Sequence, residues 1–200
     1  ERIFFVGHVM IDNLLYQLNK VNNGHLKFKY LELKERLGKY IFMTLHRPSN
    51  VDQKTTLEPI VAVLNRIAKA TPIIFPVHPR TSKMLDQFGI ELSRHIHQLP
   101  PLGFLESLYL WKDSTLVITD SGGLQEETTG LGIPCLTLRE NTERPVTVAE
   151  GTNKLVNANV LEKEVDAVLA GRGKNGKVPQ LWDGKAAERI VEVIASLANR

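Results

Sequence analysis

The sequence predicts a doubly wound α/β domain, in which a mostly parallel, Rossmann-like sheet carries helices on both faces. Short apolar runs alternate with segments of helical periodicity almost from end to end. The apolar runs show little polar alternation, which is typical of parallel strands covered on both faces. The 200 residues are enough to bury such a core. In such folds, ligands bind at the carboxyl ends of the strands.

The strand predictions rest on apolar runs, and the helix predictions on apolar residues spaced three and four apart. In TTLEPIVAVLNRIAKA, for example, Leu57, Ile60, Leu64 and Ile67 fall on one helical face. In chain order, the predicted strands are IFFV (3–6), YIFMT (40–44), PIIFPV (72–77), HIHQL (95–99), TLVIT (115–119), PCLTL (134–138) and, more weakly, NKLV (153–156). Helices are predicted at 10–20, 29–37, 54–70, 80–88, 103–112, 122–131 and 161–170.

Three parts of the chain are expected. Residues 1–171 contain the alternating pattern and form the Rossmann-like domain. The segment GRGKNGKVPQ is rich in Gly and Lys, which indicates a mobile stretch, so 172–183 is expected to be a linker or loop. Residues 184–199 read as an amphipathic helix that could pack on another domain.

Composition narrows the possible partners and location. The net charge of +3 is small and no Lys/Arg block stands out, so no nucleic-acid partner is expected. No apolar run approaches the ~20 residues of a membrane span, so no membrane partner is expected either. The single cysteine, Cys135, precludes an internal disulfide and suits a reducing, cytoplasmic setting.

The predicted strand ends carry polar side chains suited to an anionic ligand. LHRPSN follows 40–44 and supplies His46, HPR follows 72–77 and supplies His78 and Arg80, and RENTERP follows 134–138 and supplies Arg144. Loop residues are polar by default, so each alone is weak evidence. Together on one edge of a parallel sheet they favour an anion site.

The segment DSGG, where a predicted strand leads into a predicted helix, is the most specific local indication of an anion site. Ser121 is a suitable N-cap, and Gly122 and Gly123 would be the first helical residues. The N–H groups of a first helical turn lack partners, and glycine lets a phosphate approach them. Glu127 lies one turn below Gly123, where it could accept hydrogen bonds from a ribose. The competing interpretation is a tight turn in which Glu126 and Glu127 are solvated charges.

No metal or redox cofactor is expected. His95 and His97 share one face of a predicted strand, but no third ligand of suitable spacing is visible. Residues 3–10 lack the G-x-G-x-x-G that follows the first strand of a dinucleotide-binding domain.

Several motifs together resemble the non-hydrolysing UDP-N-acetylglucosamine 2-epimerases. They are VGHVMIDNLL, TLHRPSNVD, FPVHPRT, PPLGFLESLYL, VITDSGGLQEETTGLGIPCLTLRENTERPVTV and EGTNKLV, in this order. The resemblance implies the C-terminal half of a GT-B-like enzyme whose active site lies between two domains. It further implies that the N-terminal domain, with the carboxylates that act on C2, is missing, and that the full-length protein is a homodimer.

The resemblance also implies roles for individual residues. Ser121, Gly122 and Gly123 would hold the diphosphate, Glu127 the ribose and Arg144 a phosphate. His46 would be catalytic and face the pyrophosphate and the sugar. The Leu102 backbone would border the uracil, and His78 and Arg80 would line the same cleft.

The chemistry that the resemblance implies is loss of UDP and the C2 proton, followed by re-addition of UDP with the opposite C2 configuration. UDP-N-acetylglucosamine would thus be interconverted with UDP-N-acetylmannosamine for cell-surface polysaccharide synthesis, although this chain alone would be inactive. Three alternatives stay open: a hydrolysing epimerase that releases N-acetylmannosamine, a GT-B glycosyltransferase and a non-catalytic UDP-sugar-binding module.

Overall fold

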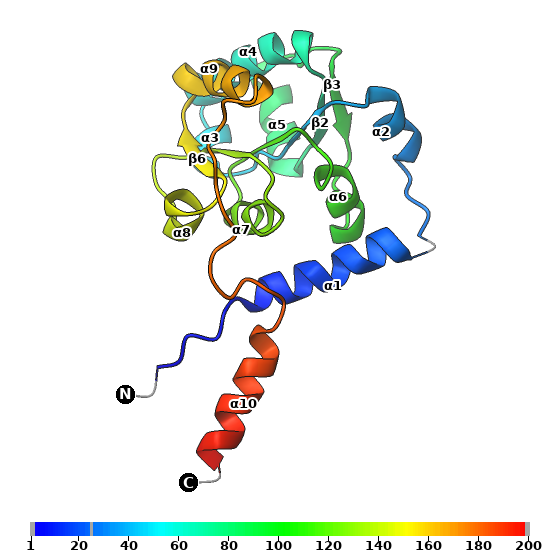
Figure 1. Ribbon diagram of the computed structural model, residues 1–200. Helices are drawn as coiled ribbons and strands as arrows, with labels where there is room; N and C mark the ends of the chain where they lie inside the picture. The colour runs from blue at the N-terminus through cyan, green and yellow to red at the C-terminus, as the bar shows by residue number, and fades with distance from the viewer. Residues whose placement is uncertain (1–2, 25, 199–200) are drawn as a thin grey trace.

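The computed structural model describes residues 3–24 and 26–198, which fold around one six-stranded parallel sheet (Figure 1). The strand order is β3-β2-β1-β4-β5-β6, and every neighbouring pair is parallel. This order confirms the predicted doubly wound fold. The strands are β1 (Ile41–Met43), β2 (Ile73–Pro76), β3 (Ile96–Leu99), β4 (Leu116–Thr119), β5 (Cys135–Leu138) and β6 (Asn153–Val156).

Helices cover both faces of the sheet (Figure 1). Their bounds are α1 (Val9–Asn23), α2 (Leu31–Leu37), α3 (Pro48–Val51), α4 (Lys54–Ala70), α5 (Pro79–Phe88), α6 (Phe104–Trp111), α7 (Gly122–Gly130), α8 (Pro145–Ala149), α9 (Ala158–Leu169) and α10 (Ala186–Ala198). The sequence did not predict α3 and α8, because four and five residues are too few to show a period. Both begin with proline at the first helical position.

Successive strand residues point to opposite faces, and each face has its own core. Ile41 and Met43 of β1 pack with α4, α5 and α9, whereas Phe42 between them packs with α1, α6 and α7. All three side chains are fully buried. Burial on both faces is why the strands read as continuous apolar runs.

The strand predicted at 3–6 is wrong. These residues belong to no helix or strand, and Ile3 and Phe5 are 90% and 70% exposed. The sheet ends at β3 and β6, so the apolar run has no neighbouring strand to pair with. The helix that follows starts at Val9, where the Nδ1 atom of His8 accepts a hydrogen bond from the Met10 N–H.

The last helix, α10, extends away from the sheet and contacts α1 (Figure 1). Its start is fixed by Asp12 of α1, whose carboxylate accepts hydrogen bonds from the N–H groups of Ala186 and Ala187 at 3.1 and 2.8 Å. Val191 and Ile194, farther along, are 65% and 61% exposed. The helix therefore presents an apolar face that these described residues leave uncovered.

The loop between α9 and α10 is packed against the domain. The Lys174 ammonium donates hydrogen bonds to the main-chain carbonyls of Val148 and Asn153. Trp182 is 8% exposed and its ring meets His8 edge-on at 5.0 Å. This loop joins α9 and α10 without helix or strand, and these contacts anchor it to the domain.

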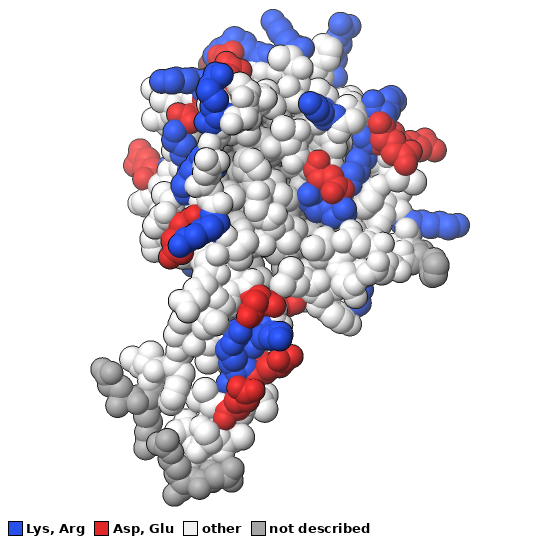
Figure 2. All heavy atoms as spheres, viewed as in Figure 1, with Lys and Arg blue, Asp and Glu red and all other residues white. Residues whose placement is uncertain are grey.

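Charged side chains are interspersed on the face shown in Figure 2, where basic and acidic groups alternate over the α/β core. Among residues 3–24 and 26–198, no helix has the length and apolar character to cross a membrane.

Candidate functional site

The candidate site lies where the strand order reverses, at the carboxyl ends of β1 and β4. Strands on either side of this point lead into helices on opposite faces, which leaves a crevice between their loops. A pocket of about 300 Å³ opens there. Six of the residues predicted from the sequence line it: His46, His78, Leu102, Ser121, Gly123 and Glu127.

The first turn of α7 forms the floor of this crevice. Ser121 occupies the N-cap and the helix begins at Gly122, as predicted, but the Ser121 side chain makes no capping hydrogen bond. The Thr119 hydroxyl accepts from the Ser121 N–H at 3.0 Å instead. A Cβ atom added at Gly122 or Gly123 would meet nothing closer than 3.9 and 3.7 Å, respectively. Packing therefore does not require either glycine, and the space beside the N–H groups of this turn is open.

Asp120, directly before this turn, points away from the crevice and fixes the loop after β1. Its buried carboxylate accepts hydrogen bonds from the main-chain N–H groups of His46 and Arg47 at 2.9 and 2.7 Å, and from the Asn50 amide at 3.1 Å. Burial alone would raise the pKa of Asp120, but the His46 side chain and the main-chain N–H groups of Arg47 and His46 outweigh it and lower the pKa. Asp120 is therefore ionised, and its charge is offset by four donors.

The His46 ring, in the loop after β1, is held by Asp120, which follows the neighbouring strand β4. Its Nδ1 atom lies 3.0 Å from the Asp120 carboxylate, and its side chain is 39% exposed. The hydrogen bond to Asp120 raises the pKa of His46, and partial burial opposes that shift. With Nδ1 donating to Asp120, the other ring nitrogen, Nε2, is free to donate into the pocket as part of an imidazolium.

His78, the N-cap of α5, and Arg80, in the first turn of that helix, follow β2 but differ in their surroundings. The His78 ring lies 5.6 Å from that of His46 and lines the same pocket. Its Nδ1 atom accepts from the Arg80 N–H at 3.1 Å and caps α5. The Arg80 guanidinium forms a two-pronged ion pair with Asp52 at 2.7 and 2.5 Å and does not line the pocket.

Glu127 lies one turn below Gly123 on the pocket side of α7. Burial and the neighbouring Glu126 carboxylate raise the pKa of Glu127 to about 7. The group therefore exchanges its proton near neutral pH. A carboxyl group at this depth can accept or donate a hydrogen bond to a ligand hydroxyl.

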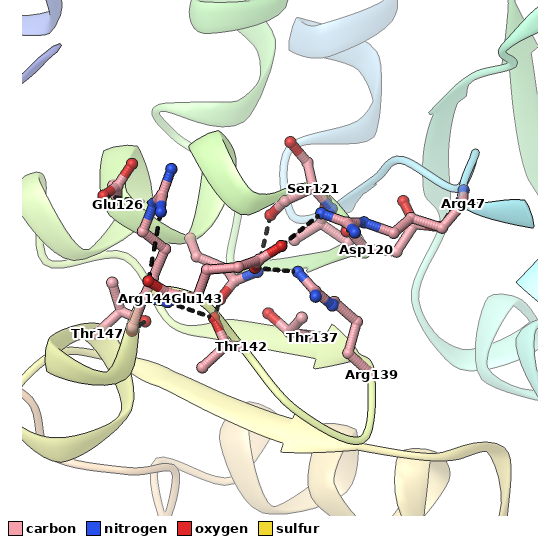
Figure 3. A network of polar contacts seen from close by, with 12 residues as sticks. Arg47, Asp120, Ser121, Glu126, Thr137, Arg139, Thr142, Glu143, Arg144 and Thr147 are labelled. Atoms are coloured by element: carbon pink, nitrogen blue, oxygen red, sulfur yellow. Dashed lines mark hydrogen bonds and ion pairs between the residues drawn. The ribbon is translucent and has the colours of Figure 1, made fainter. Parts of the chain in front are cut away.

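Arg144 lies on the other side of α7, one turn below Gly122, beside Glu126 (Figure 3). Its Nε atom and the His8 Nε2 atom both lie 2.8 Å from the same Glu126 oxygen. Glu126 is only 4% exposed, so the interpretation of it as a solvated charge is wrong. Arg144 lines a second pocket, of about 530 Å³, together with His8, Glu126 and Trp182.

A larger hollow of about 650 Å³ lies on the far side of the loop after β1. Arg47, Asn50, Thr56 and Asn157 contribute to its lining, but no residue of the α7 start does. Its lining lacks the glycine-rich helix start and the histidine pair of the crevice. Among the described residues, no cluster of His, Cys, Asp and Glu is suited to a metal ion.

Sequence reasoning assigned no role to several polar side chains that support these loops, some exposed and some buried. Glu143 bridges Arg139 at 2.6 Å and Arg47 at 3.4 Å, which ties the loop after β5 to the loop after β1. The hydrogen bond from Arg139 lowers the pKa of Glu143 to about 2. Two residues farther inside, Gln125 and Asn153, are fully buried. Polar residues inside otherwise apolar helical and strand patterns were the available signal.

The sequence and the fold both match known proteins. The family model described as UDP-N-acetylglucosamine 2-epimerase matches residues 1–195. A UDP-N-acetylglucosamine 2-epimerase of Methanocaldococcus jannaschii is 40% identical over 97% of this chain, and a UDP-2,3-diacetamido-2,3-dideoxy-D-glucuronate 2-epimerase of Pseudomonas aeruginosa is 35% identical over 98%. The chain spans about half of each, 55% and 53%.

A solved structure agrees with these relatives. The crystal structure of the M. jannaschii UDP-GlcNAc 2-epimerase in complex with UDP-GlcNAc and UDP superposes with a TM-score of 0.78 at 38% identity. The match covers 97% of this chain and 55% of that one. The fold is therefore that of the C-terminal half of a two-domain, GT-B-type epimerase.

Proposed function

Because the chain belongs to the UDP-N-acetylglucosamine 2-epimerase family, we propose that it is the UDP-binding part of an enzyme that epimerises a UDP-2-acetamido sugar at C2. The crevice at the strand-order reversal carries this proposal. Free helix N–H groups, a histidine with a raised pKa and a half-buried carboxyl group converge there. Such a set suits a ligand that carries phosphate at one end and hydroxyl groups at the other.

The diphosphate would lie at the start of α7, over Ser121, Gly122 and Gly123. The open space above both glycines supports this placement. Glu127, one turn lower, would hold the ribose, and the uracil would lie toward Leu102 at the far end of the pocket. Arg144 would reach the phosphates from the opposite side of the helix.

The chemical step that this chain supports is the departure and return of UDP. Charge accumulates on the phosphates as the bond to C1 breaks, and fixed donors that meet this charge lower the barrier. His46, whose pKa is raised by the hydrogen bond to Asp120, would donate to the departing diphosphate in its protonated form. Its pairing with a buried carboxylate orients the ring and favours its charged form.

Proton removal and return at C2 also require a base and an acid. We propose that these groups lie in the part of the protein that corresponds to the unmatched half of its relatives. The exposed apolar face of α10 would pack on that part. By the same resemblance, the full-length protein would be a homodimer, and the single cysteine of this chain suits a cytoplasmic setting.

The two relatives are named for different UDP sugars, so the family alone does not specify the sugar. UDP-N-acetylglucosamine and UDP-N-acetylmannosamine are the proposed pair because the family description and the matched structure both name the former.

Calorimetry of the 200-residue chain with UDP tests the binding proposal, with CDP as a base control and His46→Ala as a site control. We expect UDP to bind, His46→Ala to weaken it and no turnover of UDP-N-acetylglucosamine to occur. Absence of UDP binding would reject the proposal. In the full-length protein, proton NMR should show UDP-N-acetylmannosamine; free N-acetylmannosamine with an equal amount of UDP would instead identify a hydrolysing enzyme.

A further inference from the structure

Two fully buried amide side chains lie behind the crevice, Gln125 on α7 and Asn153 on β6. Neither lines the crevice or the pocket beside Arg144. Their positions in sequence are 28 residues apart, and the Asn153 Nδ2 atom donates to the Gln125 Oε1 atom at 3.1 Å. Burial of a polar group destabilises the fold unless all of its donors and acceptors are paired. The partners of these two amides therefore indicate what their burial achieves.

The first connection runs from this amide pair to the Arg144 N–H group. The Thr142 hydroxyl donates to the Gln125 Oε1 atom at 2.7 Å. The same hydroxyl accepts from the Arg144 main-chain N–H at 3.0 Å. Figure 3 shows Thr142 beneath the Arg144 main chain while the guanidinium extends toward Glu126.

The second connection holds the carbonyl group of Arg144. The Thr147 hydroxyl donates to that carbonyl at 2.7 Å, and it accepts from the Asn153 Nδ2 atom at 3.1 Å. The Asn153 Oδ1 atom in turn accepts from the Thr137 hydroxyl on β5 at 2.7 Å. Both main-chain polar groups of Arg144 are thus connected to the amide pair.

The third connection leads to the helix start. The Gln125 Nε2 atom donates to the Ser121 carbonyl at 3.0 Å, one turn back along α7. A single buried side chain therefore contacts the segment proposed to hold the diphosphate and, through Thr142, the arginine proposed to meet it. The Arg144 guanidinium can meet a phosphate at the α7 start only if the loop and the helix keep a fixed separation.

We propose that Gln125 and Thr142 are positioning residues for phosphate recognition, which set the Arg144 main chain against the first turn of α7 without touching the ligand. This inference rests on the proposed UDP-binding function. The two buried polar side chains would then serve the geometry of an anion site rather than the stability of the fold.

Thr142→Val is the decisive variant, because valine keeps the shape and leaves Gln125 and Asn153 paired with each other. By calorimetry with UDP, we expect it to raise Kd about fivefold, the usual effect of one lost hydrogen bond. In an Arg144→Ala background, the same change should alter Kd by less than about twofold, because no guanidinium remains to be positioned. Thr142→Ser should bind UDP like the unmutated chain.

Thr152→Val is the matched control, since the buried Thr152 hydroxyl donates to the Ile133 carbonyl and has no connection to Arg144. It should lower Tm as much as Thr142→Val yet leave Kd unchanged. Equal losses of affinity in Thr152→Val, additive losses in the double variant, or an unchanged Kd in Thr142→Val would each overturn the inference alone. Absence of UDP binding by the unmutated chain would overturn the proposed function and this inference with it.

Discussion

Replacing Gly123 with valine separates a phosphate-binding role from a structural one. The Cβ atom at this position would lie 3.7 Å from the Met10 methyl group, an ordinary contact. Valine forms helix better than glycine by roughly 0.3 kcal/mol in a helix interior, and less at its second position. For a chain of this length the expected shift in apo Tm is therefore about 1 °C. The branched side chain would, however, occupy the space above the free N–H groups.

The assay is thermal melting with and without UDP. Ligand at about 100 times its Kd stabilises a folded chain by about 2.7 kcal/mol. That corresponds to a rise in Tm of roughly 5–10 °C for the unmutated chain. We expect Gly123→Val to abolish this rise while its apo Tm stays within about 2 °C of that of the unmutated chain.

Gly130→Ala, at the other end of α7, is the matched control. Its Cβ atom would lie 2.8 Å from Ile11 Cδ1, a fully buried side chain that would have to move. This variant should melt lower and still gain stability from UDP. If Gly123→Val behaved in that way instead, the glycine would be structural and the phosphate interpretation of the α7 start would be refuted.

Three further predictions concern charged groups. Arg144→Ala should weaken UDP binding tenfold or more, the effect of a charge-assisted phosphate contact of about 1.5–3 kcal/mol, whereas Arg139→Ala should weaken it less; equal calorimetric losses would contradict the assignment. Asp120→Asn should lower the pKa of His46, because the hydrogen bond that raises it is lost, and an NMR titration of His46 that matches the unmutated chain would contradict this. Glu127→Gln should raise Tm at pH 8 but not at pH 4: the folded-state pKa of about 7 lies above the ordinary 4.5, so the carboxylate destabilises the fold as pH rises between these values. The gain should be on the order of 1 kcal/mol after solvent screening, and an equal gain at both pH values would contradict the argument.

Local patterns predicted most of the fold. The apolar spacing of 54–70 predicted α4 with both of its bounds, and the apolar runs predicted all six strands of the sheet. The run at 3–6 failed because an apolar stretch specifies burial but not the partner that provides it. Here, none of the described residues covers that stretch.

The candidate site was predictable in part. The glycines at the start of α7 and the polar residues at strand ends could be recognised because a helix start and a strand end are local features. Arg80 could not be distinguished from His78 in this way, since its ion pair with Asp52 connects residues 28 positions apart.

By itself, the sequence determined the order of helices and strands, the glycine-rich helix start and the family to which the motifs belong. Only the tertiary structure decided which charged groups meet. It placed Asp120 against His46, 74 residues away, and Glu126 against His8, 118 residues away. The physical reason is that burial periodicity is encoded within a few turns of chain, whereas the pairing of charges depends on which strand ends the sheet order brings together.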